Sequence, residues 1–293
     1  MVAAAVLFGT TGTAQALGPD GMNPLSVGAV RQAIGGLALG LIGLVGWLFR
    51  EGWRWPRASR KLGWVVLGGT SIMAFQATFF AGTRLNGVAI GTVIALGSSP
   101  AFAGLFEWLR GHRPSARWAV ATSVAVVGLL LLSGLVGSTA QVDPVGVVCS
   151  LIAGAAYAAY AVAAADLLRQ GLHPISATAA ILGTSGVIAL VVLPFTDVSW
   201  LRQTSGLAMA GWLGLVTVVV TYLLVGNALR HLSAATAVTL GLAEPITAAT
   251  LGVLVLGESL GAVQWLGLGA VLAGVVIAGS RGRVADPESV PTG

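Results

Sequence analysis

The sequence predicts an all-α membrane protein with ten transmembrane helices, built from two inverted repeats of five helices each. The first observation is composition: 56% of the 293 residues are apolar and 9% are charged, whereas an ordinary soluble domain carries about 25% charged residues. The second is a series of apolar stretches near the length of about 20 residues that crosses a bilayer as a helix. The third is a set of matching residues in the two halves of the chain.

The apolar stretches follow one another with short connections between them. We predict transmembrane helices at residues 2–18, 25–49, 62–82, 87–109, 117–136, 145–168, 175–195, 207–228, 234–256 and 262–279. Turn residues such as Gly18-Pro19-Asp20-Gly21 and Asp143-Pro144 mark the loops, which leave no room for a soluble domain. Residues 281–293 are polar and contain two prolines, and we expect a disordered cytoplasmic tail there.

The two halves of the chain carry the same residues at corresponding places. The matched pairs are Asn23-Pro24 with His173-Pro174, Gly63-Trp64 with Gly211-Trp212, Pro100 with Pro245, Trp118 with Trp265, and Gly128 with Gly274. We therefore predict one repeat over 2–136 and a second over 145–280. Because each repeat has an odd number of spans, the second must insert upside down, an arrangement that commonly places a substrate site near the bilayer midplane.

The basic residues predict the orientation of the chain. With a cytoplasmic N-terminus, the cytoplasmic loops hold twelve Lys and Arg residues and the outer loops hold only Arg84 and Arg202. Basic residues concentrate in cytoplasmic loops, so we expect both termini in the cytoplasm and the chain in the cytoplasmic membrane. The basic residues form no patch on a polar domain, so the net charge of +5 does not indicate a nucleic-acid partner.

The sequence offers no constellation for enzymatic or metal chemistry. Cys149 is the only cysteine, and no P-loop, His-Glu-x-x-His or Gly-x-Ser-x-Gly motif occurs. We therefore expect no catalytic residue, no metal site and no cofactor.

Polar residues within the predicted spans are the candidates for a binding or coupling site, because a charge at the centre of a spanning helix is costly to insert. Glu244 lies about 15 Å into its helix and Arg31 about 9 Å into its own, at about 1.5 Å per residue. We expect Glu244 to bind a proton or a substrate amine, and Arg31 to pair with Glu244 or hold a carboxylate. The alternatives are a neutral, hydrogen-bonded Glu244 and an Arg31 that extends to the interface.

Four further polar residues and two prolines complete the candidate set. Gln76 and Gln15 are expected in a polar layer with Arg31, and Tyr157 and Tyr160 are expected along a cavity; interhelical hydrogen bonds and packing are the alternatives. Pro100 and Pro245 are expected to break helices 87–109 and 234–256 at matching places, because proline cannot donate the helical hydrogen bond.

Several short motifs occur in a specific order along the chain: Phe8-Gly9-Thr10, Arg31, Ser99-Pro100, Glu244-Pro245 and Leu256-Gly257-Glu258. Glu244-Pro245 occupies the place in the second half that Ser99-Pro100 occupies in the first. From about residue 2 to 280 the chain resembles the EamA family of the drug/metabolite transporter superfamily. It departs from that family in having Gly111-His112-Arg113 where a second Leu-Gly-Glu often stands.

The resemblance implies a ten-helix bundle that transports, and often exports, amino acids, related metabolites or amphipathic compounds. We expect a secondary transporter, an exporter working by alternating access, with protons as a candidate coupling ion and a homo-oligomer as a further candidate partner. The alternative is a membrane-embedded protein that does not transport, either an enzyme acting on lipid or an assembly or sensor subunit.

Overall fold

The computed structural model describes residues 1–49, 59–134, 142–257 and 259–280. Within these ranges the chain is helical and contains no β-strand. The expected tail at 281–293 lies outside the described residues.

The first repeat consists of α1 (Val2–Ala16), α2 (Pro24–Phe49), α3 (Ser59–Leu109) and α4 (Ala116–Leu132). The long helix α3 contains two spans, Lys61–Gly87 and Ile90–Leu109. They meet at Gly87, whose φ of 79° and ψ of 158° are not helical. Glycine takes a positive φ without a steric penalty, so this residue turns the chain back with almost no loop.

The second repeat has the same number of spans but more interruptions. It consists of α5 (Pro144–Arg169), α6 (Pro174–Val192), two 3₁₀ turns (Leu193–Phe195 and Ser199–Arg202), α7 (Thr204–Gly211), α8 (Thr221–Ala228), α9 (Ala234–Gly241), α10 (Glu244–Leu256) and α11 (Ala262–Gly279). A π-helix at Trp212–Val220 joins α7 to α8 in one span, and α9 and α10 together form another.

The prediction of ten spans is confirmed for the described residues. Eight helical segments are long and apolar enough to cross a membrane, and the shorter helices α1 and α4 complete the set. Two local predictions need correction. The helix predicted at 62–82 continues to Gly87, so Arg84 lies on its last turn and not in a loop. The helix predicted at 234–256 is divided before Glu244.

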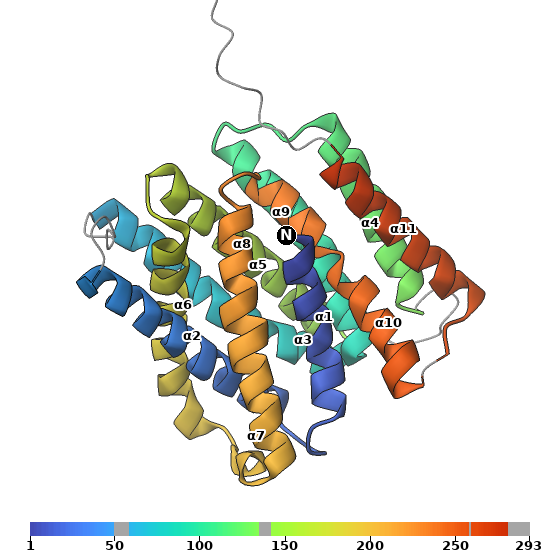
Figure 1. Cartoon of the computed structure of the whole chain (residues 1–293). Helices are drawn as coiled ribbons and strands as arrows, with labels where there is room; N and C mark the ends of the chain where they lie inside the picture. The colour runs from blue at the N-terminus through green and yellow to red at the C-terminus, as the bar shows by residue number, and fades with distance from the viewer. Residues whose placement is uncertain (50–58, 135–141, 258, 281–293) are drawn as a thin grey trace, which may run out of the picture.

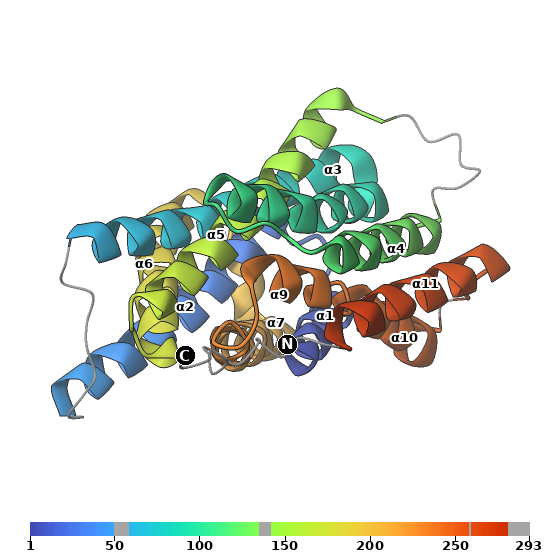
Figure 2. The same ribbon diagram turned by 90° about the horizontal axis from the view of Figure 1, so that it is seen from above.

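Helix packing follows the two-fold relation expected of inverted repeats. The equivalent helices α2 and α6 pack against each other on one side of the bundle, and α4 and α11 pack against each other on the other side (Figures 1 and 2). The contact between α1 and α10 has its counterpart in the contact between α5 and the second span of α3. Small residues permit these close approaches: a Cβ on Gly128 would lie 2.4 Å from the backbone nitrogen of Val271.

The bundle has two ends, which we name by the predicted orientation. The inner end is where α5 ends and α9 begins, and the outer end is where α2 and α5 begin.

Candidate functional site

A cavity of about 430 Å³ lies between the two repeats. Its walls come from α1, α2, both spans of α3, α5, α8, α9 and α10. The polar side chains on its lining are Thr11, Gln15, Arg31, Gln76, Thr83, Thr92, Ser99, Tyr157, Tyr222 and Glu244. Five of the six polar residues predicted from the sequence, all except Tyr160, therefore share one cavity.

Glu244 lines the cavity at the point where the ninth span is interrupted. The α-helical pattern stops after Gly241, and the N–H groups of Leu242 and Ala243 donate to the carbonyls of Thr239 and Leu240 at 3.1 and 3.2 Å. The chain resumes as α10 with Glu244 at its first position and Pro245 at its second. Proline fits the first turn, where its N–H is not needed, and a carboxylate is favoured at the positive N-terminal end of a helix.

The motif Phe8-Gly9-Thr10 places α1 directly against this interruption. A Cβ on Gly9 would lie 2.5 Å from the Cβ of Thr247 and 2.7 Å from the carbonyl oxygen of Glu244. Only a residue without a side chain lets the two backbones approach so closely, so Gly9 sets the position of the first turn of α10.

Arg31 and Glu244 both face the cavity, close enough to attract each other but without a direct ion pair. Both side chains are partly accessible and both belong to the cavity lining. The ion pairs among the described residues do not include one between Arg31 and Glu244. The Nε atom of Arg31 is buried and has no hydrogen-bond partner within the described part of the chain. Buried charges are normally paired, so this arrangement leaves room for a ligand that carries both signs.

Aromatic side chains form the apolar walls of the cavity. Phe75 packs on Phe79 with ring centroids 5.4 Å apart and on Tyr157 at 5.7 Å. On the α8 side, Tyr222 meets Phe8 edge-on at 5.3 Å. The faces of such rings attract cations and cover apolar groups.

Tyr160 lies behind this wall and not on it. It is 1% exposed and packs between Tyr157, at 6.1 Å, and Tyr222, at 5.4 Å. All three tyrosines of the chain therefore form one cluster. Tyr222 was not among the residues predicted from the sequence, although it stands within a predicted span and tyrosine is rare in this chain.

The two matched prolines differ in their effect on the helices. Ser99 and Glu244, the residues that precede them, both line the cavity, but Pro100 and Pro245 do not. The interruption expected of both prolines occurs at Pro245, whereas the helix runs through Pro100, since the only non-helical residue within α3 is Gly87.

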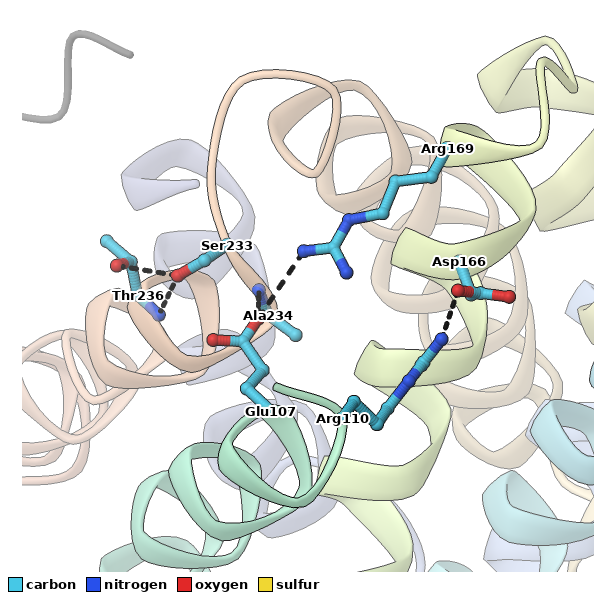
Figure 3. A network of polar contacts seen from close by, with 7 residues as sticks. All are labelled: Glu107, Arg110, Asp166, Arg169, Ser233, Ala234 and Thr236. Atoms are coloured by element: carbon cyan, nitrogen blue, oxygen red, sulfur yellow. Dashed lines mark hydrogen bonds and ion pairs between the residues drawn. The ribbon is translucent and has the colours of Figure 1, made fainter. Parts of the chain in front are cut away.

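A second polar cluster, which the sequence analysis also missed, lies at the inner end of the bundle (Figure 3). It contains Glu107 and Arg110 of α3 and Asp166 and Arg169 of α5. Glu107 and Asp166 stand within predicted spans, which was a signal for burial. Among the described residues no group of three or more His, Cys, Asp or Glu side chains could hold a metal ion.

Ten spans in inverted repeats, enclosing a central cavity with charged and aromatic walls, define a multi-pass membrane transporter. The chain belongs to the EamA-like transporter family, whose sequence profile matches residues 1–134 and 144–280. The resemblance seen in the sequence is thereby confirmed.

Relatives extend over most of the chain. The uncharacterized transporter YwfM of Bacillus subtilis is 36% identical over 286 residues, covering 96% of this chain and 92% of its own length. The threonine/homoserine exporter RhtA of Escherichia coli K12 is 31% identical over 246 residues, covering 81% of this chain and 77% of its own. A solved crystal structure, at 18% identity, superposes with a TM-score of 0.77 over 94% of this chain and 95% of the solved chain, which establishes the fold alone.

Proposed function

We propose that the chain exports small zwitterionic, amphipathic metabolites, amino acids above all, across the cytoplasmic membrane by alternating access. One observation carries the proposal: Arg31 and Glu244 face the same cavity without pairing with each other. An α-amino acid brings a carboxylate for the guanidinium and an ammonium group for the carboxylate. A bound zwitterion would therefore supply a direct partner of opposite charge to each of the two groups at once.

The cavity also suits the rest of such a molecule. A volume of about 430 Å³ falls within the range of about 300–1,000 Å³ usual for small-molecule sites. The wall of Phe75, Phe79 and Tyr157 can cover an apolar side chain. The name of the relative RhtA, a threonine/homoserine exporter, supports amino acids as the class to be tested first.

Binding of a panel of amino acids to the purified protein tests this function. We expect α-amino acids to bind and to compete with one another. Their methyl esters, which lack the carboxylate, and the corresponding acids without the amine should bind at least about tenfold more weakly, the loss expected for a buried charge left unpaired.

Two variants connect the binding to the proposed residues. Arg31→Gln should weaken binding of the amino acid but not of its ester, and Glu244→Gln should weaken binding of the amino acid but not of the deaminated acid. The matched controls are Arg202→Gln and Asp197→Asn, which change exposed residues outside the cavity. Equal binding of amino acids, esters and deaminated acids would contradict a zwitterion site.

A further inference from the structure

The cavity extends toward the outer end of the bundle and not toward the inner end. Its lining includes Gln15 at the end of α1, Pro24 at the start of α2 and Thr83 near the end of the first span of α3. All three lie at the outer end. The lining contains none of the four charged residues of the inner polar cluster, which stand at the inner ends of α3 and α5, beyond the cavity-lining residues Ser99 and Tyr157 of the same helices.

Glu107 is the most deeply buried member of the inner cluster, with 5% of its surface exposed. Its Oε1 atom accepts a hydrogen bond of 2.8 Å from the backbone N–H of Ala234, the first residue of α9, and lies 4.0 Å from Nη2 of Arg169 (Figure 3). Ser233 caps the same helix by accepting from the N–H of Thr236 at 3.1 Å. Glu107 therefore fastens the inner start of α9 to the inner end of α3.

The second ion pair of the cluster joins Arg110 to Asp166 (Figure 3). The guanidinium of Arg110 also lies over the ring of Trp64, with its Cζ atom 4.6 Å from the centroid. The other oxygen of Asp166 accepts from the side-chain amide of Gln170 at 2.6 Å. Both oxygens of Asp166 are thus engaged, and its pair with Arg110 holds the inner end of α5 against the second span of α3.

Both ion pairs of the cluster, and the hydrogen bond from Ala234 to Glu107, cross from one repeat to the other. Trp64, Glu107 and Arg110 belong to the first repeat, while Asp166, Arg169 and Ala234 belong to the second. A movement of the repeats that opened the cavity at the inner end would have to separate these partners. We propose that Glu107, Arg110, Asp166 and Arg169 form an inter-repeat ionic latch that closes the inner end and must break for the cavity to open there. The inference rests on the alternating access proposed above.

The repeat-equivalent positions at the outer end do not carry the charged residues of the latch. The offsets between matched residues place the counterparts of Glu107 and Arg110 within 252–257, a segment of sequence Gly-Val-Leu-Val-Leu-Gly. The counterparts of Asp166 and Arg169 are Ala16 and Pro19. Because both ion pairs found among the described residues lie at the inner end, the latch favours the state in which the cavity opens outward.

Accessibility of a single cysteine in the cavity tests the latch without knowledge of the substrate. Gly241→Cys is a suitable reporter, because Gly241 lines the cavity and a Cβ there would lie 3.6 Å or more from its neighbours. The background carries Cys149→Ser. In oriented vesicles, the parent protein should react with a membrane-impermeant maleimide from the outer side only.

The latch variants Glu107→Gln, Asp166→Asn and Arg169→Gln should increase the rate of labelling from the inner side by at least about fivefold, the lower end of an ordinary coupling between two states. Arg113→Gln, which removes an exposed charge near the end of α3, is the matched control and should leave the rate unchanged. The charge exchange Arg110→Asp with Asp166→Arg should return labelling toward the parent value.

Unchanged inner-side labelling in variants that elute as folded, monodisperse protein would overturn the latch. Arg169→Gln keeps the test decisive if the more buried variants do not fold, because the side chain of Arg169 is 41% exposed. Failure of amino-acid binding would leave this result intact, since labelling requires no substrate. The two proposals can therefore fail separately.

Discussion

Ser99 and Glu244 occupy equivalent places, each directly before a matched proline and each on the wall of the cavity. Only one of them can ionise, so the chemical symmetry of the two repeats is broken at the centre of the molecule. The carboxylate stands at the first position of α10, and Arg31 of α2 is the other charged residue on the cavity lining. A group in this position can carry a proton when substrate is absent and release it when an ammonium group arrives.

Removal of the ionisable group at position 244 is predicted to uncouple transport from the proton gradient. Glu244→Gln keeps the size of the side chain but cannot change its protonation state. We expect uptake driven by an imposed pH gradient in proteoliposomes to fall at least about tenfold, a change of about 1.4 kcal/mol, while insertion into the membrane stays normal. Exchange of labelled for unlabelled substrate should persist at saturating concentration. Full gradient-driven uptake by the variant would assign Glu244 a structural role.

At the scale of helices, the same close contact occurs twice. Gly9 of α1 lies against the start of α10, and a Cβ on Gly154 of α5 would lie 2.7 Å from the carbonyl oxygen of Ala95 in the second span of α3. The two contacts are related by the inverted repeat, and each one positions the cavity-lining residue before a matched proline. Glycine is needed at these two positions because a side chain would keep the helices apart, and not because the backbone adopts an unusual conformation.

A side chain added at Gly9 or Gly154 is predicted to push the contacting helices apart. Gly9→Ala and Gly154→Ala each insert a methyl group where no space exists, and overpacking of this kind typically costs about 1–3 kcal/mol. We expect a lower thermal unfolding midpoint in detergent for both variants, together with weaker substrate binding. Gly269→Ala is the control, because a Cβ there meets nothing within 4 Å and α11 is exposed at that point. Equal midpoints for Gly9→Ala and Gly269→Ala would show that α1 can move away without loss.

The helices themselves were predictable from the sequence, because spans near 20 apolar residues separated by turn residues leave few alternatives. The interruption at Pro245 was not distinguishable from the continuous helix at Pro100, since both prolines carry the same local signal and tertiary contacts decide between them. Arg31, Gln76 and Glu244 could be identified as candidates because burial of polar groups in a membrane is costly. Hydropathy does not determine how each helix is rotated about its axis. The direction in which Tyr160 and Tyr222 face, and the pairing of Glu107 with Arg169, depend on that rotation and so could not be predicted.

At the scale of the whole molecule, the inner polar cluster lies at the end of the bundle that is predicted to face the cytoplasm. The inner end carries the ionic latch, and the excess of basic residues there predicts that this end faces the cytoplasm. An exporter at rest would then be closed to the cytoplasm and open to the outside. Substrate capture would require the latch to open, which couples the inner surface to the cavity through α3, α5 and α9.

The orientation itself can be measured with one cysteine at each end, in a variant carrying Cys149→Ser. His112→Cys lies in the exposed turn after α3 at the inner end, and Gln203→Cys lies in the exposed connection before α7 at the outer end. The excess of basic residues at the inner end predicts that a membrane-impermeant maleimide added to intact cells labels Gln203→Cys alone. His112→Cys should react only after the cells are broken, which also shows that the thiol is accessible. Labelling of His112→Cys in intact cells, with Gln203→Cys protected, would invert the orientation and place the latch at the outer surface; the same cavity would then open toward the cytoplasm.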